Sequence, residues 1–205
     1  MIGLLLLSNA AFAHQPNIVS DENVVNIELP QISKAFYGEL KGREHYFQIT
    51  SDKKFSLYIQ ITLPDLPGIN RDINAEIVKM QEGKEVLVKT LEGKDFNWTP
   101  FYEPFGADNY LEGPDYSNPS AEAGSYLIKV YNENNTGKYV LVTGKTEEFP
   151  VMEILHTIKV LPQVKTFFEK SPYTAYLNLS GAFMLFPVLL ILIIIKIVMV
   201  LMKRS

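Results

Sequence analysis

The chain has 205 residues, 47% of them hydrophobic, and a formal net charge of −4. This length is enough for one sizeable domain besides two apolar ends. The absence of cysteine excludes disulfides, thiolate metal sites, a cysteine nucleophile and a lipid anchor on cysteine. Every acidic residue precedes position 170, so the middle of the chain is acidic and we expect it to bind no nucleic acid.

The first apolar run covers residues 2–12 and contains four consecutive leucines. It is too short to cross about 30 Å of hydrocarbon. It ends in Ala11-Phe12-Ala13, a small-x-small pattern that signal peptidase accepts. We therefore predict a signal peptide over residues 1–13, although no basic residue precedes the apolar run. The alternative is a buried apolar strand.

Residues 14–149 show the alternation of apolar and polar side chains that is typical of half-buried strands. The clearest case is residues 55–63, where Phe55, Leu57 and Ile59 alternate with polar neighbours. Turn signals rich in glycine, proline, asparagine and aspartate separate the runs. The pattern predicts eight strands, over residues 24–29, 34–40, 45–50, 55–63, 73–80, 85–91, 125–131 and 138–143. Such a set favours an extracytoplasmic, antiparallel, jelly-roll-like β-sandwich.

Two segments of this region are similar to a known family. Residues 34–63, KAFYGELKGREHYFQITSDKKFSLYIQITL, resemble the opening of the bacterial pre-peptidase C-terminal domain. Residues 123–143, AGSYLIKVYNENNTGKYVLVT, resemble its closing hairpin. The resemblance implies a jelly-roll-like sandwich that serves as an accessory binding or stabilising module.

Residues 95–122 read as a long insertion between strands, and a loop of this length is often functional. It is rich in aromatic side chains that are suited to stacking on a sugar or burying a peptide, namely Trp98, Phe101, Tyr102, Phe105, Tyr110 and Tyr116. It also carries acidic residues that are weak candidates for binding Ca²⁺, namely Glu103, Asp108, Glu112 and Asp115. The alternative is that the rings only cap one end of the sandwich while the acids face water.

The sequence favours no catalytic site. None of its three histidines has a metal-ligand partner at helical spacing. It contains no nucleophile elbow, zinc-protease motif or phosphate-binding loop. We therefore expect no catalytic residues, no enzyme activity and no cofactor, with weakly bound calcium as the exception. A hydrolase that uses Glu103 or Asp108 remains an alternative.

Residues 150–181 form a predicted helical linker beside the membrane. Apolar residues recur near helical spacing after Pro150, and Pro162 suggests a break, so we expect one or two short helices. These helices either lie on the outer leaflet or pack on the sandwich, and we expect packing.

Residues 182–202 predict a transmembrane helix, because 21 residues span about 31 Å and only Lys196 is charged. Lys196 either reaches the interface with its long side chain or pairs with a partner helix. Lys203 and Arg204 follow in a short tail, residues 203–205, and place the C-terminus in the cytoplasm.

We therefore expect a single-pass protein of the plasma membrane whose non-enzymatic β-sandwich binds another envelope or surface protein, or a glycan. An accessory subunit of a membrane complex, held through residues 150–202, is the main alternative.

Overall fold

The computed structural model describes residues 14–20 and 24–202. The predicted signal peptide over 1–13 and the predicted tail with Lys203 and Arg204 lie outside the described residues.

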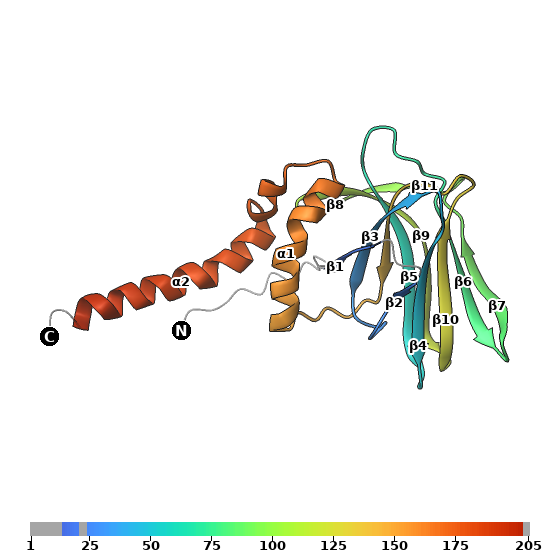
Figure 1. Cartoon of the computed structure of the whole chain (residues 1–205), viewed down its shortest axis with the longest axis horizontal. Helices are drawn as coiled ribbons and strands as arrows, with labels where there is room; N and C mark the ends of the chain where they lie inside the picture. The colour runs from blue at the N-terminus through green and yellow to red at the C-terminus, as the bar shows by residue number, and fades with distance from the viewer. Residues whose placement is uncertain (1–13, 21–23, 203–205) are drawn as a thin grey trace.

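The described strands form two sheets packed face to face (Figure 1). The first sheet has the order β1-β3-β11-β5-β9-β8 and the second has the order β2-β4-β10-β6-β7. The first sheet consists of β1 (Gln15–Ile18), β3 (Lys34–Lys41), β11 (Thr136–Thr143), β5 (Phe55–Pro64), β9 (Asp108–Ala121) and β8 (Thr99–Glu103). The second consists of β2 (Val25–Asn26), β4 (His45–Ser51), β10 (Gly124–Tyr131), β6 (Asn74–Gln81) and β7 (Lys84–Leu91). The β-sandwich prediction is confirmed, and all eight predicted strands are present, although β2 is shorter than expected.

The expectation of purely antiparallel sheets is wrong, because β1 runs parallel to β3 and β2 runs parallel to β4. Parallel neighbours need a connection that crosses over before the chain returns. Here the chain passes through β2 of the second sheet between β1 and β3 of the first. Both sheets are therefore mixed, with one parallel pair at an edge of each.

The interior between the sheets is filled by side chains from the inward faces of both. The alternating residues of β5 that the sequence singled out, Leu57, Ile59, Ile61 and Leu63, are at most 1% exposed. They pack with Phe47 and Ile49 of β4, Ile77 of β6 and Ile128 of β10. Period-two alternation therefore identified this core correctly.

The prediction that residues 95–122 form a long loop is wrong, because residues 99–121 form β8, β9 and the turn between them. β9 pairs with β5 along most of its length, and the ladder is irregular at two places. Gly113 and Pro114 lie in one irregularity and Pro119 lies in the other. Proline cannot donate a ladder hydrogen bond, so it is tolerated at such interruptions and on edge strands such as β8, which contains Pro100. These residues gave the strand the appearance of a loop.

A helix, α1 (Val151–Phe167), covers the outer face of the first sheet (Figure 1). Its buried side chains Val160 and Val164 pack with Phe168 against Tyr37 of β3 and Val140 of β11. This contact confirms that the linker packs on the sandwich.

The expected break at Pro162 is wrong, since α1 continues through that residue. Proline removes the hydrogen bond that the carbonyl of Ile158 would accept. The hydroxyl group of Tyr176 donates to this carbonyl at 3.0 Å instead. A side chain from the following segment thus replaces the lost bond and keeps the helix whole.

The chain then forms a short 3₁₀ helix, η1 (Pro172–Tyr176), and a long helix, α2 (Leu179–Met202), that runs away from the sandwich (Figure 1). Among the described residues, no helix meets the requirements for crossing a bilayer. The prediction of a transmembrane helix over residues 182–202 therefore stays a prediction.

Candidate functional site

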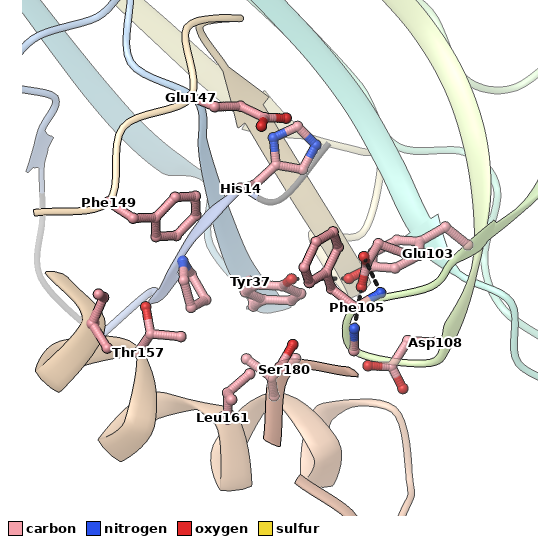
Figure 2. A pocket seen from close by; sticks show the side chains of 15 residues that line it. His14, Tyr37, Glu103, Phe105, Asp108, Glu147, Phe149, Thr157, Leu161 and Ser180 are labelled. Atoms are coloured by element: carbon pink, nitrogen blue, oxygen red, sulfur yellow. Dashed lines mark hydrogen bonds between the residues drawn. The ribbon is translucent and has the colours of Figure 1, made fainter. Parts of the chain in front are cut away.

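A pocket of about 260 Å³ lies between α1 and the outer face of the first sheet. Figure 2 shows Tyr37 of β3 on the sheet side, with Thr157 and Leu161 of α1 facing it. Phe105, in the turn between β8 and β9, and Ser180, in the first turn of α2, complete the wall. The pocket therefore lies where the sandwich, α1 and α2 meet.

Asp108 begins β9, and its side chain is buried under α1. Its Oδ2 atom accepts a hydrogen bond from the ammonium group of Lys165 at 2.6 Å, and its Oδ1 atom accepts one from Lys170 at 2.8 Å. The side chains of Asp108 and Lys165 are 1% and 2% exposed. Lys165 also donates to the carbonyl of Gly106, and Lys170 donates to that of Ala107 at 2.6 Å. This network holds α1 on the turn, because separating it would leave buried charges unpaired.

Glu103 ends β8 and reaches the pocket from the same turn. Its two carboxylate oxygens accept hydrogen bonds from the backbone N–H groups of Phe105, at 2.7 Å, and Gly106, at 2.6 Å. Burial raises the pKa of Glu103 above its ordinary value, although these two N–H groups and Lys165 oppose the rise. The carboxylate therefore shapes the turn, with one backbone hydrogen bond to each of its oxygens.

Two tyrosines form the polar part of the sheet wall. The hydroxyl groups of Tyr37 and Tyr110 are hydrogen-bonded to each other at 2.9 Å. Burial raises the pKa of both hydroxyl groups, so both stay protonated at neutral pH. The Tyr110 ring also packs edge-on against Phe168, with centroids 4.8 Å apart. Each hydroxyl group thus has a hydrogen-bond partner within the pair.

His14 lines the pocket just before β1. Its ring Nδ1 shares a hydrogen bond with the hydroxyl group of Ser33. Burial lowers the pKa of His14 to about 4, so the ring is neutral at pH 7. Figure 2 shows the side chain of Glu147 next to this ring. The N-terminal strand thus contributes a neutral polar group to the pocket.

The six aromatic residues predicted as a binding loop do not form one exposed surface. Trp98 is 7% exposed, and its indole N–H donates to the carbonyl of Gly93 at 2.9 Å. Its ring fills the space above Gly113, where a Cβ atom would collide with it. Trp98 therefore lies in the sandwich core, and Tyr116 packs against that core.

Of the other four aromatic residues, Phe101, Phe105 and Tyr110 lie near α1. Phe101 packs against the cluster under α1, and Tyr110 belongs to that cluster. Phe105 lines the pocket together with Tyr110. Tyr102 is 56% exposed and remains available for an outside contact.

Of the four candidate calcium ligands, only Glu103 and Asp108 come together, in the turn beside α1. Glu112 and Asp115 lie further along β9, opposite Thr62 and Gln60 of β5. Both oxygens of Asp108 face ammonium groups, an environment that repels a divalent cation. Within residues 14–20 and 24–202, no group of three or more acidic or histidine side chains is arranged to hold a metal ion.

Sequence reasoning missed Lys165, Lys170, Tyr37 and His14 as members of this site. One signal was present, because Lys165 belongs to the buried stripe of α1 that also includes Thr157, Leu161 and Val164. A lysine on an apolar helix face needs a buried acidic partner. The sequence alone did not identify Asp108 as that partner, since 57 residues separate them.

No protein-family model and no curated protein matches this chain. Among solved structures, it is similar to the pre-peptidase C-terminal domain of collagenase from Bacillus anthracis, at 13% identity and a TM-score of 0.34, covering 63% of this chain and 94% of that one. It is also similar to the Yersinia pseudotuberculosis-derived mitogen, at 11% identity and a TM-score of 0.37, covering 59% of this chain and 92% of that one. A surface-associated copper-binding protein of Methylomicrobium album BG8 matches at 7% identity and a TM-score of 0.33, covering 64% of this chain and 100% of that one. The solved structures that the chain is similar to thus include a pre-peptidase C-terminal domain, the family that residues 34–63 and 123–143 resemble.

Proposed function

We propose that this chain is a non-enzymatic binding module that α2 anchors in the plasma membrane, with the sandwich outside the cytoplasm and the C-terminus inside. One observation carries the proposal: α2 leads away from the sandwich with its large apolar side chains exposed. These are Phe186, Leu189, Leu190, Leu192, Ile193, Ile194, Ile195, Ile197, Val198, Met199, Val200 and Met202. Such a surface is costly in water, because each buried side chain of this kind contributes about 1.5–3 kcal/mol.

The length and complete sequence of this segment support the same proposal. α2 has 24 residues, about 36 Å at 1.5 Å per residue, which suits a hydrocarbon core of about 30 Å. Lys196 is the only charged residue in 182–202, and it lies near the end that Lys203 and Arg204 follow. A bilayer accepts a lysine near its interface because the long side chain reaches the head groups.

The sandwich is fastened to the start of α2 by backbone and side-chain hydrogen bonds. The N–H group of Ser180 donates to the carbonyl of Phe105 at 3.0 Å, and the side-chain amide of Asn178 donates to that of Gly106 at 2.9 Å. Together with the Asp108–Lys165 pair, these contacts favour a sandwich held in one orientation at the membrane. The second sheet then faces away from α2 (Figure 1).

The outer face of this second sheet offers a surface for a protein partner. Leu87 of β7, Val78 of β6 and Leu127 of β10 are paired across the strands in one row. They point away from the core, because their neighbours Ile77 and Ile128 point into it. Leu87 is 57% exposed and the nearby Met80 is 37% exposed, whereas Val78 is buried, so Leu87 and Met80 form the accessible part of this surface. Of the six predicted aromatic residues only Tyr102 is well exposed, so a protein partner is favoured over a stacked glycan.

The absence of enzyme activity is also part of the proposal. Asp108 is paired with two lysines and Glu103 is held by two backbone N–H groups, so both carboxylates already serve the structure. A hydrolase would need at least one of them oriented toward a substrate. Substituting Glu103 by Gln is expected to alter stability and to abolish no hydrolytic activity.

Membrane fractionation tests the anchor. We expect the full chain to stay in the membrane pellet after alkaline carbonate extraction. A variant that carries Ile193→Lys and Ile194→Lys should move to the supernatant, because two charges near the middle of the segment oppose insertion. Recovery of the unaltered full chain in the soluble fraction would contradict the proposal.

Cross-linking in intact membranes tests the partner surface. We expect Leu87→Asp combined with Met80→Asp to abolish capture of a partner, while Tyr102→Asp leaves capture unchanged. If only Tyr102→Asp abolishes capture, the partner binds at the β8 edge instead.

The exposed side chain of Lys196 favours one alternative, an accessory subunit held by contacts within the bilayer. Lys196→Leu would then release the chain from its complex without releasing it from the membrane. Under our proposal, Lys196→Leu changes neither the binding of the partner nor the attachment to the membrane.

A further inference from the structure

The pocket under α1 is lined mainly by hydrophobic side chains. They come from the residues just before α1, from α1 itself and from the β8–β9 turn, and they include Phe105, Phe149, Ile154, Leu161 and Val164. At about 260 Å³ the pocket is larger than an apolar cavity of about 150 Å³ that accepts benzene. It is smaller than the sites of drug-sized ligands, which begin near 300 Å³. Its size and lining fit a single hydrocarbon chain.

The pocket adjoins the segment that we assign to the membrane. Ser180 lines it and belongs to the first turn of α2, two residues before the predicted span begins at Ala182. The connecting segment exposes Tyr173, Leu177 and Leu179, which are 83%, 82% and 57% exposed. These side chains and the pocket residue Ser180 belong to one stretch of chain between α1 and the predicted span, so apolar groups that a lipid chain could contact adjoin Ser180 in sequence.

The polar groups of the pocket select against an anionic ligand. Among the described residues that line it there is no lysine or arginine, and the ionisable ones are His14, Glu103, Asp108, Glu147 and the two hydrogen-bonded tyrosines. Asp108 is neutralised by lysines that approach it from α1 and the residues just after it. A phosphate or carboxylate head would meet acidic groups without a free cation, so the occupant enters with its hydrocarbon end.

We infer that this pocket receives the end of an acyl chain from a bilayer lipid, so that the sandwich is held at the membrane by lipid as well as by α2. The inference rests on the proposed membrane anchorage. It extends that proposal by giving α1 a second role, as the wall of a lipid site.

Photolabelling of the full chain tests this inference. The chain is reconstituted into phosphatidylcholine nanodiscs that contain a small fraction of phosphatidylcholine with a diazirine at the methyl end of one acyl chain. After irradiation, mass spectrometry maps the labelled residues. We expect label on the pocket residues Tyr37, Leu161 and Val164 in addition to α2.

Two variants make the test specific. Leu161→Trp fills the pocket and should lower labelling of Tyr37 about ten-fold, because a close-packed site has no room for the chain. Leu155→Trp lies on the exposed side of the same helix and should leave that labelling unchanged. Circular dichroism melting checks that both variants fold. If Leu161→Trp does not fold, Thr157→Leu serves as a smaller filling change in the same wall.

The outcomes separate this inference from the proposed function. Label on α2 alone, or pocket labelling that neither filling variant reduces, overturns the lipid site and leaves the anchor standing. Absence of label from both α2 and the pocket overturns both.

Discussion

The first sheet has two faces that are covered in different ways. Its inner face meets the second sheet through a core of apolar and aromatic side chains that includes Phe47, Ile59, Ile61 and Ile128, each 0% exposed. Its outer face meets α1 through a smaller apolar cluster that also holds a buried ion pair, a tyrosine pair and a pocket. One face is closely filled, whereas the other combines apolar contact with specific polar pairs.

The difference indicates what each interface does. Hydrophobic burial has no direction, so the inner face supplies most of the stability of the sandwich. A buried ion pair contributes little net stability because both charges lose water, but it is sensitive to geometry. We therefore expect Asp108 and Lys165 to determine where α1 sits on the sheet. Positioning matters here because α1 leads directly to α2.

The largest expected effect is in the inner core. Phe47→Ala leaves a cavity under Phe36 and Tyr139, and should lower the free energy of unfolding by about 3–5 kcal/mol. The single tryptophan, Trp98, is buried beside the same core, so its fluorescence during urea titration reports the loss. Tyr102→Ala, at an exposed position, should leave the transition within about 0.5 kcal/mol. If Phe47→Ala lowers the free energy of unfolding by less than about 1 kcal/mol, the inner core is not the main source of stability.

The next largest effect is expected at the outer face. Asp108→Asn leaves the Lys165 ammonium group buried without its anion and should weaken the docking of α1 by about 3 kcal/mol. This value is near the low end for breaking a buried ion pair, because the second lysine, Lys170, can turn to water. Hydrogen exchange should show faster opening of the α1 amides, while the urea unfolding transition reported by Trp98 fluorescence shifts little. Asp108→Leu combined with Lys165→Met should restore protection, since it removes both charges. If Asp108→Asn shifts both readouts equally, the two interfaces unfold as one unit.

The same contrast explains what could be predicted from sequence. The inner core follows from period-two alternation, so strands such as Phe55–Pro64 and Gly124–Tyr131 were found almost to the residue. β9 was not found, because Gly113, Pro114 and Pro119 interrupt its ladder and imitate a loop. Strand propensity describes individual residues and does not reveal that a proline lies at a bulge.

The outer face was harder to predict because its pairs join distant parts of the chain. Tyr37 and Tyr110 are 73 residues apart, and the sequence placed Tyr37 on a strand but Tyr110 in a predicted loop. Pro162 was expected to break α1, yet the Tyr176 hydroxyl group replaces the missing bond. Local patterns cannot specify such partners, since they depend on how the whole chain is packed.

A smaller effect is expected from the tyrosine pair in the pocket wall. Tyr37→Phe leaves the Tyr110 hydroxyl group buried without its partner and should cost about 1 kcal/mol of α1 docking. Adding Tyr110→Phe should recover part of this loss, because no unsatisfied hydroxyl group then remains. Protection of the α1 amides from hydrogen exchange measures both the loss in the single variant and the recovery in the double variant. Greater protection in the single variant than in the unaltered chain would show that the hydrogen bond does not hold the wall together.

The smallest effect is a dependence on pH at the edge strand β1. The pKa of His14 is lowered by burial from about 6.5 to about 4, so the unfolded segment binds a proton more readily than the folded one. The contribution of His14 to stability is therefore complete above about pH 6.5 and is lost as the pH falls toward 4. Because the His14 side chain is only half-buried, solvent screens this effect, and we expect a loss below about 1 kcal/mol. Hydrogen exchange of the Gln15–Ile18 amides, corrected for intrinsic rates, should rise between pH 7 and pH 5 in the unaltered chain. It should not rise in the His14→Gln variant. An equal rise in both proteins would assign the effect to another group.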